Sequence, residues 1–302
     1  MSTRINLQNT PDPSSVQRSS VRFRRGDIEL QGLLFTPAEG EAQRPAVIVT
    51  GAWTTVKEQM AGTYARELAA KGFVALAFDF AGWGESGGAP RFREDPVAKT
   101  ADIHAAVEFL ASRPEVDPER IAGLGVCASS GYMAAAVADN PKLSKLALVA
   151  PWIHDPAMAE GIYGGAEAAA NLIELGRTAE ASAEDQAIVA ASATDESSLM
   201  YQAPYYTEPD RGLIDAYDNQ FNVSSWEPWL RYDGQASADR LAAPTLIVCS
   251  EAAALPASAH AYAERTQAPV RERWLDEVNQ FDFYDRADVV AEAVAAVAEH
   301  LG

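Results

Sequence analysis

Cys127 is the residue whose neighbours in the sequence most clearly suggest chemistry. It lies in the segment 125–131, which reads Gly-Val-Cys-Ala-Ser-Ser-Gly and joins an apolar stretch to an alanine-rich one. A nucleophile on a sharp turn between a strand and a helix needs small residues two positions before and after it, because the strained backbone leaves no room for larger side chains. Gly125 and Ser129 meet that need. The segment predicts a nucleophile elbow, with Cys127 as the nucleophile and the backbone N–H of Ala128 as an oxyanion donor.

The state of the Cys127 thiol is predicted from its place at the start of a helix. The positive end of the helix dipole favours the thiolate, and therefore nucleophilic reactivity. The alternative is that Cys127 is a small buried residue that happens to follow a strand. The second cysteine, Cys249, does not have the spacing of a metal site or a disulfide framework with Cys127. We therefore predict no metal, and a role for cysteine only as a thiol.

Short apolar strands alternate with amphipathic helices around this segment. Strands are predicted at 46–49, 74–80, 121–124, 146–150, 245–249 and 271–275, and helices at 57–71, 99–113, 130–140, 258–266 and 287–301. Two further strands, 21–24 and 28–36, flank a turn and suggest an antiparallel hairpin. This alternation is typical of a parallel sheet with crossover helices. The sequence predicts an α/β fold with an eight-stranded, mostly parallel sheet and helices on both faces.

The alternation of strands and helices stops between residues 152 and 239. There the sequence becomes rich in alanine and glutamate and then in aromatic residues. We predict a helical cap insertion at 152–239, a core formed by 20–151 and 240–302, and a flexible arm at 1–19. The cap aromatics either pack the cap onto the sheet or line a pocket.

The net charge of -19 over 302 residues limits the partners that the chain is expected to have. Such a charge repels phosphate backbones and anionic lipid surfaces, so we predict no nucleic-acid partner and no membrane partner. A neutral or weakly polar small-molecule substrate fits better, and no cofactor is predicted. Because no signal pattern and no apolar run of about 20 residues is present, the predicted compartment is the cytoplasm. A homodimer is one assembly that the sequence leaves open.

Several segments in one order resemble those of bacterial dienelactone-hydrolase-like α/β-hydrolases. They are 56–59 (Val-Lys-Glu-Gln), 77–79 (Ala-Phe-Asp), 84–88 (Gly-Glu-Ser-Gly-Gly) and 116–121 (Val-Asp-Pro-Glu-Arg-Ile), and the elbow continues the match. The resemblance runs from about Val47 to Leu301 and implies the α/β-hydrolase fold. It also implies that the loop after the first parallel strand supplies a second oxyanion donor. That donor is the backbone N–H of Trp53, with Ala52 or Thr54 as near alternatives, and the Trp53 indole is expected to form a wall of the site.

The resemblance also locates departures from an ordinary hydrolase of this fold. Related sequences carry a histidine in a segment resembling H-x-D-x-Y-D, whereas 280–285 reads Gln-Phe-Asp-Phe-Tyr-Asp. Gln280 cannot accept and return a proton near neutral pH as imidazole does. Ala253 stands where an aspartate would orient that histidine. Glu251 is the one acid in the segment 250–256, and with Cys127 and Gln280 it is predicted as a catalytic candidate.

Two classes of function follow. In the first, an enzyme cleaves a small ester, thioester or lactone through Cys127 and takes its proton transfer from another base. His154 is the best candidate base, because the strand 146–150 should deliver its loop to the carboxyl edge of the sheet. A surface histidine is the alternative, and Trp152 in the same loop is assigned to substrate binding. In the second class, the protein is a non-hydrolytic catalyst (a lyase, cyclase or acyltransferase) or a ligand-binding protein, in which Gln280 hydrogen-bonds a ligand carbonyl or a water.

Overall fold

The structure, a computed structural model, describes residues 4, 15–39, 43–182 and 186–302. Its centre is an eight-stranded sheet in the order β1-β2-β4-β3-β5-β6-β11-β12. These strands are β1 (Val16–Arg25), β2 (Ile28–Pro37), β3 (Arg44–Thr50), β4 (Val74–Phe78), β5 (Val116–Val126), β6 (Leu143–Val149), β11 (Thr245–Cys249) and β12 (Val270–Trp274). Strand β2 pairs antiparallel with β1 and β4, and the other neighbours pair parallel. The predicted eight-stranded, mostly parallel sheet is confirmed.

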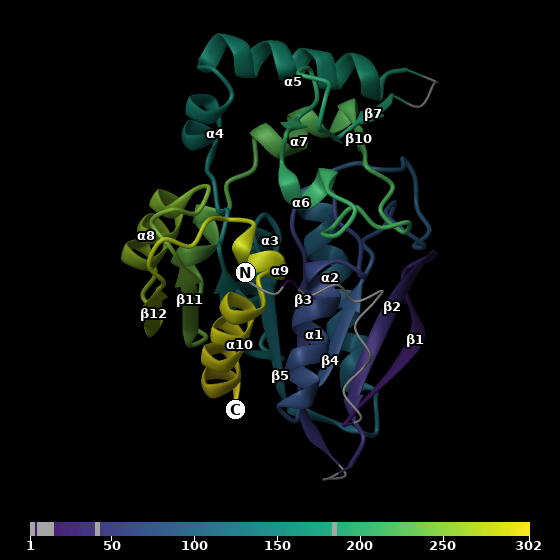
Figure 1. Cartoon of the computed structure of the whole chain (residues 1–302), viewed down its shortest axis with the longest axis vertical. Helices are drawn as coiled ribbons and strands as arrows, with labels where there is room; N and C mark the ends of the chain where they lie inside the picture. The colour runs from purple at the N-terminus through teal and green to yellow at the C-terminus, as the bar shows by residue number, and fades with distance from the viewer. Residues whose placement is uncertain (1–3, 5–14, 40–42, 183–185) are drawn as a thin grey trace.

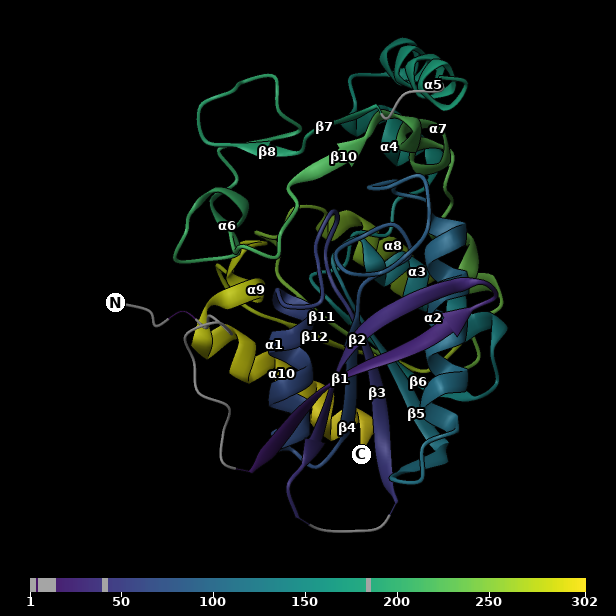
Figure 2. The ribbon, with the colours of Figure 1, turned by 90° about the vertical axis from the view of Figure 1, so that its right-hand side faces the viewer.

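Helices cover both faces of this sheet (Figure 1, Figure 2). Helices α1 (Met60–Ala70) and α10 (Ala287–Leu301) lie on one face, and α2 (Pro96–Ala111), α3 (Ser129–Asp139) and α8 (Pro256–Arg265) lie on the other. Strands covered on both faces read as continuous apolar runs, and every residue of β4 and of β11 is buried. Among the helices of the described residues, none is long and apolar enough to cross a membrane.

The first strand begins earlier than the sequence analysis placed it. Residues 16–19, predicted as part of a flexible arm at 1–19, pair with residues 34–37 in the opening hairpin. Apart from the buried Val16, these side chains are polar and gave no sign of a strand, because β1 is an edge strand whose backbone pairing does not require apolar residues on its solvated face. Residues 1–3 and 5–14 of the predicted arm lie outside the described residues.

The cap lies over the carboxyl ends of the parallel strands (Figure 1). Its helices are α4 (Pro156–Ile162), α5 (Ala166–Glu180), α6 (Pro204–Thr207) and α7 (Trp226–Leu230), with 3-10 turns η1 (Val223–Ser225) and η2 (Gln235–Asp239). It also holds two small sheets, in which β10 (Gln220–Asn222) pairs with β7 (Ala187–Val189) and β8 (Ala191–Ser192) pairs with β9 (Met200–Tyr201). Strands of two or three residues are too short to show an alternating pattern, so the sequence predicted only helices here.

Candidate active site

Cys127 occupies a strained turn between β5 and α3. Its φ of 59° lies in the left-handed region, which residues other than glycine rarely adopt. The Cys127 N–H donates to the Val149 carbonyl (3.1 Å), and the Cys127 carbonyl accepts from the Trp152 N–H (3.0 Å). A Cβ at Gly125 would lie 2.7 Å from the Ser130 Cα, so the turn requires glycine there. The neighbouring strand end and this close approach hold the turn in the geometry of a nucleophile elbow.

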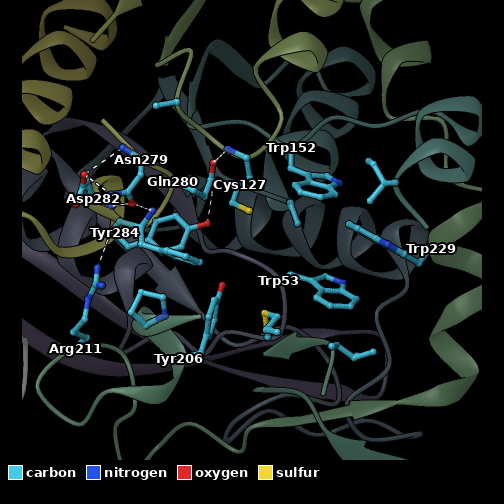
Figure 3. A pocket seen from close by; sticks show the side chains of 18 of the residues that line it. Trp53, Cys127, Trp152, Tyr206, Arg211, Trp229, Asn279, Gln280, Asp282 and Tyr284 are labelled. Carbon is cyan, nitrogen blue, oxygen red and sulfur yellow. Dashed lines mark hydrogen bonds between the residues drawn. The ribbon is translucent and has the colours of Figure 1, made fainter. Parts of the chain in front are cut away.

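The Cys127 side chain faces a cavity of about 870 Å³ between the sheet and the cap (Figure 3). Its wall is mostly aromatic and aliphatic: Trp53, Trp152, Ile162, Tyr163, Leu199, Met200, Tyr206, Trp229, Phe281 and Tyr284. Several cap aromatics therefore line the cavity, while Phe221 and Trp226 pack behind Trp53 with ring centroids 4.8 and 6.5 Å from it. The volume lies near the upper end of the range for drug-sized ligands, about 300–1,000 Å³. The cavity has room for an acyl group well beyond a few carbon atoms.

Two backbone N–H groups hydrogen-bond the Cys127 sulfur, one from Ala128 and one from Trp53. Of the neighbours of Trp53, Ala52 is engaged elsewhere, because its N–H donates to the Met60 Sδ (3.4 Å). Among the alternatives for the second oxyanion donor, the geometry therefore favours Trp53. An oxyanion formed on a carbonyl carbon attached to the sulfur would meet both N–H groups.

Burial raises the pKa of the Cys127 thiol above its ordinary value of 9.0. Hydrogen bonds from Tyr284, Ala128 and Trp53, and the neighbouring Gln280 amide, act in the opposite direction but do not outweigh the loss of solvent. The expectation of a resting thiolate is therefore wrong. Cys127 is only 8% exposed, and the loss of solvent around its side chain raises the pKa despite its place at the start of a helix. At neutral pH Cys127 is a thiol, and its proton must leave during any nucleophilic attack.

We expect alkylation of Cys127 by iodoacetamide to be slow at pH 7 and to increase with pH. Because only the thiolate reacts and the folded-state pKa is raised above 9.0, the midpoint of the rate profile should lie above pH 9. Peptide mapping by mass spectrometry separates Cys127 from Cys249, whose pKa burial raises to about 11. Free cysteine, with a pKa of about 8.5, is the reference. A Cys127 midpoint below that of free cysteine would contradict the description of the thiol.

Gln280 stands beside Cys127, where related sequences carry histidine. Its Oε1 accepts from the Ala254 N–H (3.0 Å), and its Nε2 donates to the Ala150 carbonyl and the Tyr284 hydroxyl, both at 2.9 Å. The two backbone partners fix the direction in which the amide faces, because an N–H must meet an oxygen and a carbonyl must meet a donor. The amide is therefore fully engaged, and it can orient a neighbour but cannot take up a proton.

Tyr284 is the site residue that the sequence analysis did not identify. Its hydroxyl hydrogen-bonds the Cys127 sulfur, and its side chain is fully buried in the cavity wall (Figure 3). Tyr284 lies in the short helix α9 (Asp282–Asp285), four residues after Gln280. Spacing of four residues across a helical turn brings side chains together, so this spacing was the available signal. Beside it, the buried Arg211–Asp285 pair (2.6 Å) joins the cap to the core.

His154 and Glu251, both predicted as catalytic candidates, do not line the cavity. The buried His154 ring accepts from the Trp152 indole N–H at Nδ1 (3.2 Å) and lies 2.9 Å from the Trp229 carbonyl at Nε2. Both ring nitrogens are engaged and burial lowers the pKa of His154, so it is a neutral packing residue rather than a base or a surface histidine. The exposed Glu251 carboxylate contacts His260 (2.9 Å). Trp152 does line the cavity, as predicted for a substrate-binding residue.

The turn at Cys127 is strained, two backbone N–H groups meet its sulfur, and a cap covers the carboxyl edge of a parallel sheet. Together these features define an α/β-hydrolase-fold enzyme. The sequence profile of the alpha/beta hydrolase family matches residues 46–293, and the chain belongs to that family. The uncharacterised protein YcjY of Escherichia coli is 30% identical over 90% of this chain and 93% of its own length. The crystal structure of the hypothetical protein PA2218 from Pseudomonas aeruginosa has a TM-score of 0.82 and 25% identity, covering 96% of each chain.

Two further similarities bear on the activity and on the predicted resemblance. A thiohydrolase of Aspergillus aculeatus, aneE, is 32% identical over 48% of this chain and 45% of its own length. The dienelactone hydrolase of Anabaena variabilis has a TM-score of 0.59 and 12% identity, covering 95% of this chain and 97% of its own. The second similarity is one of fold alone. Hydrolase-type enzymes are therefore among the proteins that this chain resembles.

Proposed function

We propose that the protein is an acyl-transfer enzyme that takes an acyl group from a thioester onto Cys127. The observation that carries the proposal is the pair of backbone N–H groups, from Ala128 and Trp53, at a nucleophile sulfur in an apolar cavity. In the reaction, the Cys127 sulfur attacks the carbonyl carbon and the oxyanion accepts both hydrogen bonds. The bond to the leaving sulfur then breaks, and the leaving thiol departs with the proton that Cys127 gave up.

The lack of imidazole beside Cys127 favours thioesters over esters and lactones. A cysteine thiol and an alkyl leaving thiol have similar pKa values, near 8.5, so a proton passes between them with little cost. An alkoxide leaving group is a far stronger base and depends on a general acid such as histidinium. Gln280 holds that place here, and its amide is not an acid near neutral pH. The similarity to a protein named thiohydrolase supports the same substrate class.

The acceptor of the acyl group follows from the same chemistry. Water is a poor nucleophile without a general base, and neither His154 nor Glu251 lines the cavity. The Asp282 carboxylate does line it, but this carboxylate accepts hydrogen bonds from the Asn279 amide (2.8 Å) and from the Arg286 guanidinium (3.0 Å), so it is already engaged in an ion pair. An acyl-Cys127 intermediate would therefore persist in water and pass its acyl group to a better nucleophile, such as a thiol or an amine. Acyl transfer between such acceptors is the expected main activity, with hydrolysis as a slow side reaction.

The proposal is tested with a thioester of N-acetylcysteamine and the oxygen ester of the same acyl group. The two differ in one atom, so binding in the cavity is closely matched. After each rate is divided by its rate with free cysteine, acylation of Cys127 should be at least about 10²-fold faster for the thioester. Rapid quenching and intact-mass measurement give both rates. An oxygen ester that acylates Cys127 as fast as the thioester contradicts the proposal.

A ligand-binding protein without turnover is the second candidate, and the raised pKa of the Cys127 thiol favours it. In that case the cavity would hold a ligand against Cys127 and Gln280 without transferring an acyl group. Binding is measurable by quenching of the fluorescence of Trp53, Trp152 and Trp229 in the cavity wall. A protein that binds the thioester, leaves it intact and shows no mass increase would support this second function.

A further inference from the structure

We infer that Tyr284 is a catalytic residue whose hydroxyl carries the proton from Cys127 to the leaving sulfur, and that Gln280 is the positioning residue that orients this hydroxyl. The inference rests on the proposed function and assigns its proton transfer, which no histidine in the cavity wall performs. Backbone groups determine the directions of the hydrogen bonds that Gln280 makes.

Two backbone groups fix the orientation of the Gln280 amide. The Ala254 N–H can only donate and the Ala150 carbonyl can only accept, so the Gln280 amide has one orientation that satisfies both. In that orientation the second Nε2 hydrogen is donated to the Tyr284 hydroxyl oxygen (2.9 Å). The Tyr284 oxygen is thus an acceptor toward Gln280, and its own hydrogen points elsewhere.

The remaining hydrogen-bonding capacity of Tyr284 is what the reaction requires. With one lone pair engaged by Gln280, the hydroxyl keeps one hydrogen and one lone pair, and its remaining partners are the Cys127 sulfur and the Tyr206 hydroxyl. The phenol is buried, and desolvation raises its pKa well above 10, so it does not act as a separate base or acid. It can, however, receive a proton while it gives one away.

The proton transfer balances without any further group. While the Cys127 sulfur forms its bond to the carbonyl carbon and the bond from that carbon to the leaving sulfur breaks, the thiol proton moves to the Tyr284 oxygen and the original phenolic proton moves to the leaving sulfur in the same step. Tyr284 stays neutral throughout and ends with a different proton. The negative charge that develops lies on the carbonyl oxygen, where the Ala128 and Trp53 N–H groups stabilise it.

Tyr205 provides a matched control. It is also buried, and its ring centroid lies 5.0 Å from that of Tyr284, but it is not among the residues that line the cavity. Both Nε2 hydrogens of Gln280 go to Ala150 and Tyr284, so Tyr205 receives neither of them. Tyr205→Phe therefore removes a neighbouring buried hydroxyl but keeps the proposed path intact.

The experiment compares the wild type, Tyr284→Phe and Tyr205→Phe with thioesters of one acyl group whose leaving thiols differ in pKa. An alkyl leaving thiol needs its proton, whereas a more acidic aryl thiol leaves as the thiolate. Tyr284→Phe should slow acylation of Cys127 by about 10²-fold or more with the alkyl thioester and much less with the aryl one. The wild type and Tyr205→Phe should show a shallow dependence on the leaving thiol. Gln280→Met should behave as a milder form of Tyr284→Phe.

Two outcomes would overturn the inference. One is a Tyr284→Phe protein with the wild-type rate and the wild-type dependence on the leaving thiol. The other is an equal loss across the series, which identifies Tyr284 as a packing residue. Failure of the proposed function looks different, because the wild type itself would then form no adduct on Cys127 with any thioester.

A measurement on the wild type tests the proton relay even if Tyr284→Phe does not fold. Because two protons move in one step, acylation rates in mixtures of H₂O and D₂O should follow a curved dependence on deuterium fraction. A linear dependence, which indicates one proton in motion, contradicts the relay through Tyr284. The Tyr284 ring contacts, with Tyr205 and Phe281 at 5.0 and 5.9 Å between centroids, remain available in Tyr284→Phe.

Discussion

Replacing Gln280 with histidine should shorten the lifetime of an acyl-Cys127 adduct in water by roughly 10²- to 10⁴-fold. An imidazole in this position would lie beside the Cys127 sulfur, where it can take a proton from an attacking water and return it to the departing thiol. The measurement is the decay of the adduct after a single acylation, followed by intact mass at pH 7.5. The gain should be largest for hydrolysis and small for transfer to an added thiol.

Gln280→Glu is the informative comparison for this prediction. Glutamate would place an oxygen where Nε2 now donates to the Ala150 carbonyl and to the Tyr284 hydroxyl, so both hydrogen bonds are lost. Gln280→Glu is therefore expected to lose activity. If neither Gln280→His nor Gln280→Glu changes adduct lifetime or acyl transfer, Gln280 does not act in the reaction.

Cys127→Ala should lower acyl transfer by roughly four orders of magnitude or more, because the covalent intermediate cannot form. Cys127→Ser should be nearly as inactive, since a serine hydroxyl needs a general base that this cavity does not supply. Release of the leaving thiol, followed with a chromogenic thiol reagent, measures both variants. Cys249→Ala is the matched control, because Cys249 is also a buried free thiol but does not line the cavity. A Cys127→Ala protein that keeps substantial activity contradicts the role of Cys127.

The parts of this structure that depend on local pattern were predictable. The elbow could be located from the apolar runs of β3 to β6 and the small residues around Cys127, because both features are recognisable in consecutive residues. The Ala128 donor follows from the elbow itself. The Trp53 donor and the position of Gln280 beside the sulfur were implied by the family resemblance, the latter through the frame of the segment 280–285.

The parts that depend on tertiary burial were not predictable from local pattern. The dipole of a helix is visible in a sequence, but the desolvation that raises the pKa of Cys127 comes from the cap and from aromatic side chains distant in the chain. His154 appeared to be a loop histidine, yet a Trp152 indole and a Trp229 carbonyl enclose it. The role of Tyr284 depends on the orientation of the Gln280 amide, which its tertiary contacts with Ala150 and Ala254 determine.

The decisive test of acyl transfer through Cys127 is intact-mass measurement of the protein mixed with an acyl-N-acetylcysteamine thioester. We expect a mass increase equal to one acyl group within the first turnover, located on Cys127 by peptide mapping, absent in Cys127→Ala and retained in Cys249→Ala. The adduct should persist in water and disappear on addition of a thiol acceptor. Turnover of the thioester without any adduct on Cys127, or an adduct that forms equally in Cys127→Ala, would contradict a covalent role for Cys127.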